Sequence, residues 1–122
     1  MARSTETAKV NARHAREGAM GQKYLACGER MGMRLWVETS PLPAKPATQR
    51  AYETVGYVIA GRAELKLEGK SVVLEPGDSW IVPAGALHSY TIPASFTAIE
   101  VTSPPGQQEG RDEHQGTGSA AH

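Results

Sequence analysis

The chain has few of the features that mark a disulfide-stabilised or membrane protein. Cys27 is the only cysteine among 122 residues, so no disulfide can form within the chain. No apolar run approaches the about 18 residues that a membrane-spanning helix needs. The first 20 residues are polar and lack the apolar stretch of a secretory signal. These absences predict a cytoplasmic protein that folds without a disulfide framework.

Neither sign of charge is in excess. Lys and Arg number 13 and Asp and Glu number 13, which gives a formal net charge of zero with His neutral. Proteins that bind nucleic acid or anionic membranes in a general way need a basic field to attract the phosphates. We therefore expect no nucleic-acid partner and no membrane partner.

Large apolar side chains are scarce at both ends of the chain. Residues 103–122 contain no Val, Ile, Leu, Met, Cys or aromatic residue, and residues 1–19 contain only Met1 and Val10 of this kind. Segments that bury so little cannot offset the entropy lost on ordering. We predict a flexible segment over residues 1–19, one domain over residues 20–102 and a mobile tail over residues 103–122.

The middle of the chain follows a β-strand pattern. Ala63, Leu65 and Leu67 alternate with charged residues, as in a strand with one wet face. Glu68-Gly69-Lys70 is a tight hairpin signal, and the prolines between residues 41 and 46 make residues 39–50 a loop. Short strands separated by frequent turns are typical of an all-β sandwich or barrel. The predicted strands are Gln22–Cys27, Met31–Glu38, Tyr52–Ala60, Arg62–Glu68, Ser71–Glu75, Ser79–Val82, Leu87–Ile92 and Phe96–Thr102.

A segment late in this pattern has a specific spacing. Residues 77–88 read GDSWIVPAGALH, which is Gly, five residues, Pro, any residue, Gly, two residues, His. This resembles the second conserved motif of the cupin superfamily, and the run from Tyr57 to Asp78 resembles the part between its two motifs. The resemblance covers roughly residues 50–102. It implies a small single-domain cupin of the bacterial type, a double-stranded β-helix or jelly-roll barrel, with His88 pointing into the barrel mouth.

The first cupin motif is largely missing. In metal-binding cupins it supplies two His and one Glu, which join the His of the second motif around a divalent ion such as Fe, Mn, Ni or Zn. Counting back from Gly61 places Thr54 at the Glu position. The two His positions fall on Thr48 and Arg50, or on Ala47 and Gln49 with the longer spacer. Three of the four ligand positions therefore hold residues that are not the usual ligands.

A shifted strand register offers one weak metal set. Glu53 is one residue from the Glu position, so strand alternation puts it on the opposite face unless a bulge intervenes. With such a bulge, Glu53 and Gln49 would join His88 as a poor three-donor set.

Arg50 changes what the barrel mouth would bind. A fixed cation there repels a metal ion and attracts a carboxylate or phosphate. The sequence predicts a metal-free pocket for a small polar or anionic ligand, centred on His88 and Arg50. The alternatives are that Arg50 is a surface residue and that His88 is a buried histidine bonded to a backbone carbonyl. Further hydrogen-bonding side chains of the predicted pocket are Thr48, Tyr52, Thr54 and Tyr90.

Three classes of function remain open on these residues. The first is a small-molecule-binding cupin without a standard metal site. The alternative is a metal-dependent cupin dioxygenase, isomerase or lyase with a non-standard ligand set, and the third is a partner-binding module. No catalytic residue is assigned, because no nucleophile–base pair or paired carboxylates stand at a credible site.

We also expect a homodimer. Met20–Val37 contains more apolar strand material than one small barrel needs, and small domains often gain stability by dimerising. N-terminal strands of this kind often pair with the partner subunit in cupins, so the resemblance points the same way.

Overall fold

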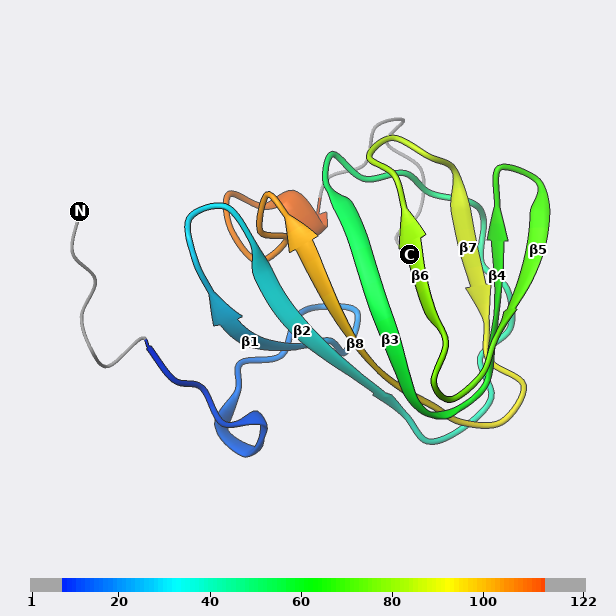
Figure 1. Ribbon diagram of the computed structural model, residues 1–122, viewed down its shortest axis with the longest axis horizontal. Coiled ribbons are helices and arrows are strands. Elements are labelled where there is room, and N and C mark those ends of the chain that lie inside the picture. Colours follow the sequence, from blue (N-terminus) through cyan, green and yellow to red (C-terminus); the bar gives the residue numbers. More distant parts are fainter. Residues whose placement is uncertain (1–7, 114–122) are drawn as a thin grey trace.

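The computed structural model describes residues 8–113, which form an all-β, cupin-like structure of two antiparallel sheets (Figure 1). The larger sheet has the strand order β1-β2-β8-β3-β6, and the smaller has the order β5-β4-β7. Within residues 8–113, two short 3-10 turns lie outside the sheets, η2 (Ala12–His14) and η3 (Arg111–Glu113). The strands are β1 (Lys23–Cys27), β2 (Gly32–Glu38), β3 (Glu53–Gly61), β4 (Ala63–Leu67), β5 (Lys70–Leu74), β6 (Ser79–Val82), β7 (His88–Thr91) and β8 (Phe96–Ser103).

All eight predicted strands are present, and their bounds differ from the prediction by at most two residues. The hairpin between β4 and β5 is confirmed, because Leu67 pairs with Lys70 across it. Glu68 and Gly69 adopt positive φ angles of 48° and 83°, as a two-residue hairpin turn requires. Among residues 8–113, no helix is both long and apolar enough to cross a bilayer.

The core lies between the inner faces of the two sheets. Strand alternation produces it, since every second residue of β3, β4 and β8 turns inward while the residues between them face solvent. The buried cluster comprises Val58, Ala63, Leu65, Leu74, Trp80, Val82, Ile92, Phe96 and Ala98.

The two N-terminal strands belong to the larger sheet of their own chain. β1 pairs with β2, and β2 pairs with β8 over its whole length from Gly32 to Glu38. The apolar material between Met20 and Val37 is therefore used within the chain, and β1 forms one edge of the sheet. Any pairing with a second copy through these strands would have to use that edge.

The C-terminal segment up to residue 113 packs against the barrel, in contrast to the solvated tail expected from its composition. Pro105, Gly106 and Asp112 are buried, and η3 lies near the end of β8 (Figure 1). Polar contacts rather than apolar burial hold this segment, which is why its lack of large apolar side chains did not predict the packing. Residues 1–7 and 114–122 lie outside the described residues.

Candidate functional site

The expected metal-ligand positions face the barrel interior. Thr48, Arg50, Thr54 and His88 are all buried, with relative exposures of 5% or less. Thr48 and His88 are backbone partners, each donating its N–H to the other's carbonyl at 2.9 Å. The register that puts Thr48 and Arg50 inward is therefore the one that the structure has.

His88 is a buried imidazole at the start of β7. Its Nδ1 lies 3.0 Å from the carbonyl oxygen of Ala86, and its ring meets Tyr90 edge-on at a centroid distance of 5.8 Å. Burial lowers the pKa of His88, against the opposing effects of the Ala86 hydrogen bond and the charge of Glu100. The neutral form is therefore favoured near neutral pH.

A buried ion pair that the sequence did not reveal lies beside this histidine. Arg34 on β2 stands directly opposite Glu100 on β8, and its Nε donates to Glu100 Oε1 at 2.8 Å. Trp36 Nε1 donates to the same oxygen at 2.7 Å. The Arg34 guanidinium also lies between two aromatic rings, 5.3 Å from the Trp36 centroid and 5.2 Å from that of Tyr52. Strand pairing and stacking thus fix both charges inside the barrel.

Asp112 of the C-terminal segment completes this network. Its Oδ1 accepts from Arg34 Nη1 at 2.7 Å and from the Tyr52 hydroxyl. Its Oδ2 accepts from the Tyr24 hydroxyl at 2.6 Å and from Gln22 Nε2 at 3.4 Å. Together these form the Asp112 network, in which the chain's own carboxylate satisfies interior donors from residues far away in sequence.

Arg50 also turns to this segment. Its Nη1 donates to the backbone carbonyl of Asp112 at 2.8 Å, and its Nη2 lies 3.3 Å from the sulfur of Met20. The interior therefore holds two arginines, Arg34 and Arg50, against two carboxylates, Glu100 and Asp112, all at most 4% exposed. These formal charges balance, as buried charges must if their desolvation is to be offset.

The network predicts a specific acid sensitivity. Burial alone would raise the pKa of Asp112, but the charge of Arg34 and the hydrogen bonds from Tyr24, Tyr52 and Arg34 lower it from 3.8 to about 2. Such a shift corresponds to about 2 kcal/mol of stability. Because the folded-state pKa is depressed, this contribution is complete above about pH 5 and is lost as the pH falls through 3.8 toward 2.

The variant Asp112→Asn tests this contribution by urea unfolding at several pH values. We expect the wild-type protein to exceed the variant by about 2 kcal/mol at pH 7, and this difference to narrow steadily below pH 5. A difference that stays constant from pH 7 to pH 3 would show that Asp112 is not held as a low-pKa carboxylate.

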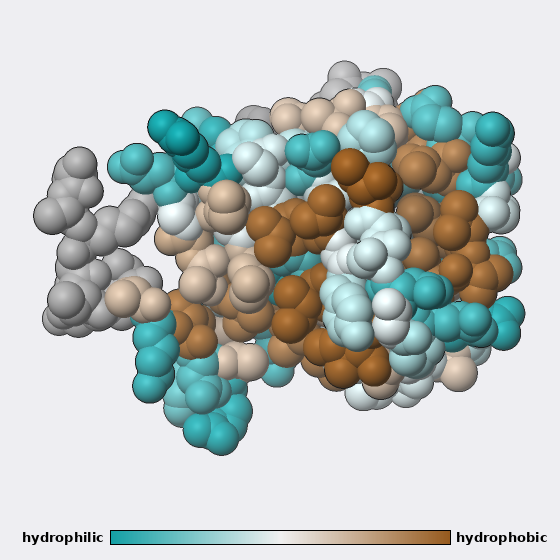
Figure 2. All heavy atoms as spheres, viewed as in Figure 1, coloured by the Kyte–Doolittle hydropathy of each residue, from teal (hydrophilic) through white to brown (hydrophobic). Residues whose placement is uncertain are grey.

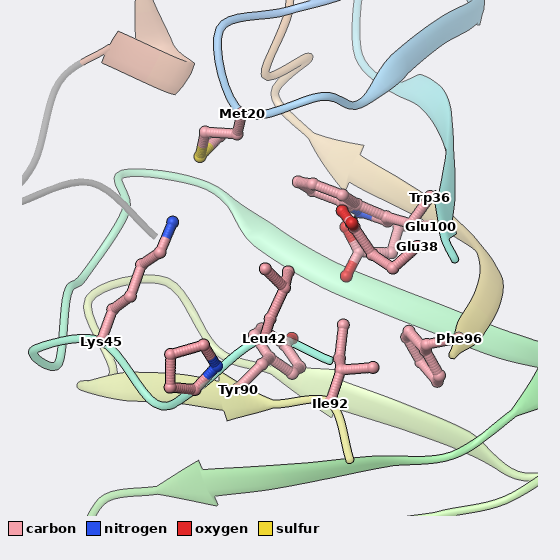
Figure 3. Close-up of a pocket in the computed structure, with 10 residues that line it drawn as sticks. Met20, Trp36, Glu38, Leu42, Lys45, Tyr90, Ile92, Phe96 and Glu100 are labelled. Carbon is pink, nitrogen blue, oxygen red and sulfur yellow. The ribbon is translucent and has the colours of Figure 1, made fainter. Parts of the chain in front are cut away.

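A cavity opens beside the network, between the larger sheet, β7 and the loop after β2 (Figure 3). The space that the centres of water-sized molecules can occupy in it is about 60 Å³, and the empty space is about 580 Å³ when the open solvent at its mouth is included. Figure 3 shows Trp36, Glu38 and Glu100 along one wall, with Lys45 and Met20 on the opposite side. The full lining is Met20, Trp36, Glu38, Leu42, Pro43, Lys45, Tyr90, Ile92, Phe96 and Glu100.

The polar groups of this cavity are mostly carboxylates. Within residues 8–113, the Arg34 and Trp36 donors both bond Oε1 of Glu100, which leaves Oε2 for a ligand. Partial burial raises the pKa of Glu38, while the charge of Lys45 opposes that rise. The cavity can therefore hold an apolar body and accept hydrogen bonds from its polar group.

The cavity and the predicted pocket overlap in one residue. Of the six side chains in the predicted pocket, His88 included, Tyr90 lines the cavity and the other five are buried in the barrel interior. Burial is the largest cause that raises the pKa of Tyr90, whose hydroxyl accepts from Trp80 Nε1 at 3.1 Å. Tyr90 is therefore a neutral phenol at the cavity wall.

The residues at the family's metal position do not fit a divalent ion. Such an ion needs about three or four N, O or S donors, and Arg50 brings a cation where a ligand is required. Glu53 is exposed on the outer face of β3, away from the buried His88, while Gln49 is half-buried. Within residues 8–113, no group of three or more His, Cys, Asp or Glu is placed to hold a metal ion.

Sequence reasoning missed Arg34, Glu100 and Asp112. A faint signal existed for the first two, since Arg34 is flanked by apolar residues in β2 and Glu100 is the one charged residue of β8. Both faces of those strands are apolar, however, so the pattern did not say which face is buried. Asp112 gave no signal, because a charged run in a glycine-rich segment is usually solvated.

Comparisons with known proteins agree with this fold. The cupin-domain family model matches residues 42–99. The structural match to an RmlC-like cupin from Shewanella frigidimarina covers 84% of this chain and 93% of that protein, with a TM-score of 0.71 and 20% sequence identity. The match to KdgF from a Halomonas species covers 79% of this chain and 91% of that protein, with a TM-score of 0.66 and 23% sequence identity.

The match to a cupin superfamily protein from Desulfitobacterium hafniense covers 74% of this chain and 82% of that protein, with a TM-score of 0.61 and 21% sequence identity. No curated protein matches the sequence significantly. At these identities the structural matches speak for the fold alone. Residues 42–99 match the cupin-domain family model, and the two sheets share the cupin-like fold of these solved structures.

Proposed function

We propose that the protein binds a small molecule in the cavity beside Glu100, without a standard metal site. The observation that supports this proposal is the cavity in the barrel, whose walls are mostly apolar and include the carboxylates of Glu100 and Glu38. Pockets of this kind, with a few convergent polar groups, are the usual small-molecule sites of globular proteins.

The lining specifies the ligand's chemistry. Trp36, Leu42, Ile92 and Phe96 favour an aromatic or aliphatic body. Glu100 favours a hydroxyl or amine that donates a hydrogen bond, and Lys45 near the opening favours an acceptor group. This ligand is polar at one end, and it differs from the anionic ligand expected around Arg50, because the Arg50 guanidinium is bonded to Asp112.

Calorimetric titration with benzylamine, benzyl alcohol and benzoate tests this proposal. We expect benzylamine and benzyl alcohol to bind more tightly than benzoate, whose carboxylate would meet Glu100 and Glu38. Leu42→Trp, which fills the cavity, and Glu38→Gln should weaken benzylamine binding, the latter by about tenfold, as for loss of a charged hydrogen bond. Glu53→Gln, on the outer face, is the matched control and should leave the affinity unchanged. Equal affinities for all three probes, or no effect of Leu42→Trp, would refute the assignment.

We also propose that two copies associate through the outer face of the larger sheet. Val37, Val55, Tyr57, Ile59 and Ile81 are each at least 43% exposed there, and Figure 2 shows apolar side chains gathered over the middle of the molecule. A continuous exposed apolar patch is typical of an interface. An uncharged patch can match itself across a two-fold axis, which supports a second copy as the partner.

Light scattering coupled to size exclusion measures this association. We expect twice the 13.0 kDa chain mass for the wild-type protein and a monomer for Tyr57→Lys. Val73→Lys, at a position of the smaller sheet that is 45% exposed against 54% for Tyr57, should remain dimeric. A wild-type monomer at high concentration would contradict the proposal.

A further inference from the structure

The side-chain donors around Asp112 are more numerous and more deeply buried than the docking of a C-terminal segment requires. Four side-chain groups converge on its two carboxylate oxygens, from Arg34, Tyr52, Tyr24 and Gln22. Arg34 and Tyr24 lie within hydrogen-bonded strands, and Gln22 and Tyr52 each stand one residue before a strand. All four are at most 6% exposed. The donors are thus held by the sheet, whereas the acceptor is held by a loop.

The segment that carries the acceptor is attached mainly by polar contacts. Gly106 N–H donates to Thr102 Oγ1 at 2.7 Å, and Gln107 Nε2 donates to the Met33 carbonyl at 3.3 Å. Other bonds stay within the segment, such as Asp112 N–H to the Gly106 carbonyl at 3.1 Å. Water can replace such bonds when the segment lifts, so this segment belongs to the less stable parts of the fold.

Departure of the segment would leave the interior short of one negative charge. Arg34 and Arg50 would then face the single carboxylate of Glu100, inside a barrel where unpaired charge is costly. The vacated position would present a guanidinium and two phenol hydroxyls in the arrangement that a planar carboxylate already satisfies.

We propose that Arg34, Tyr24, Tyr52 and Gln22 form a carboxylate-binding site, that Asp112 occupies it as a tethered ligand, and that a small carboxylate from solution can replace Asp112. Residues 103–113 then act as a built-in competitor for that ligand. This site adjoins the cavity beside Glu100 but uses different donors, so either assignment can fail without the other.

The full-length variant Asp112→Ala, with sodium acetate and sodium formate as probes, tests the site. Acetate should raise its melting temperature in a saturable way, beyond sodium chloride at equal ionic strength. The variant should bind acetate at least about tenfold more tightly than the wild-type protein, which must first release Asp112. Glu113→Ala, a matched loss of an exposed carboxylate on the same 3-10 turn, should behave like wild type. Adding Tyr52→Phe to Asp112→Ala should weaken acetate binding.

Two results would overturn the proposal. One is an Asp112→Ala protein that responds to acetate no more than Glu113→Ala does. If that variant does not fold, Asp112→Asn takes its place, and Arg34 Nη1–H resonances that do not shift with acetate are equally decisive, because Nη1 is the atom that bonds Asp112. The other concerns the wild-type protein, in which saturating acetate should accelerate hydrogen exchange of the Asp112 amide. Unchanged exchange would show that an outside carboxylate does not displace the segment.

Discussion

Replacing Arg34 with methionine should lower the free energy of unfolding by about 3–5 kcal/mol, the range for breaking a buried ion pair from one side. Arg34 bonds both Glu100 and Asp112, whose side chains are 3% and 1% exposed. Methionine fills similar space but leaves both carboxylates without their cation. It also removes the contacts of the guanidinium with the Trp36 and Tyr52 rings.

Urea unfolding at pH 7 measures this loss. Arg62→Met is the matched control, because Arg62 is exposed between β3 and β4 and its replacement should change stability by no more than about 0.5 kcal/mol. Combining Arg34→Met with Glu100→Gln should recover part of the loss, since one uncompensated charge is removed. A loss below about 1 kcal/mol for Arg34→Met would mean that the interior charges are solvated rather than paired.

Gly61→Ala should destabilise the fold by about 3 kcal/mol. Gly61 has φ 78°, a conformation that costs a residue with a Cβ about 1–2 kcal/mol. An added Cβ would also collide with the carbonyl oxygen of Ser95 and lie 2.8 Å from the Phe96 Cα. These are backbone atoms at the start of β8 and cannot rotate away, so overpacking adds about 1–3 kcal/mol.

Gly77→Ala separates the two contributions to that loss. Gly77 has φ 92°, but nothing lies within 4 Å of an added Cβ. We therefore expect about 1–2 kcal/mol for Gly77→Ala, from backbone strain alone. Equal losses for the two variants, measured by urea unfolding, would show that the β3–β8 contact at Gly61 is looser than described.

The strands were predictable because their signals are local. Alternation in β4, the turn at Glu68-Gly69 and the spacing of Gly77, Pro83 and Gly85 each act within a few residues. Thr48, Arg50 and Thr54 were picked out by counting back from Gly61 along the resembling cupin motif; their burial comes from the structure. The family match over residues 42–99 covers the part of the chain where these signals are strongest.

The interior chemistry was less predictable because its partners are distant in sequence. Asp112 meets Arg34 across 78 positions and Tyr52 across 60. Nothing in the composition of residues 103–113 separates a carboxylate that docks from one that is solvated. Arg50 was predicted as the anion-binding cation; in the structure Arg34 bonds the carboxylate of Asp112, and Arg50 bonds the backbone carbonyl of the same residue.

The fold and the proposed carboxylate site both depend on Asp112 being buried and ionised in the barrel interior. The ¹³C NMR titration of its side-chain carboxyl in the intact protein tests this directly, from pH 7 downward. We expect the carboxyl to be still ionised at pH 4, with a pKa of about 2. A carboxyl that titrates at 3.8 or above while the protein remains folded would show that Asp112 is not held as a buried, ionised carboxylate.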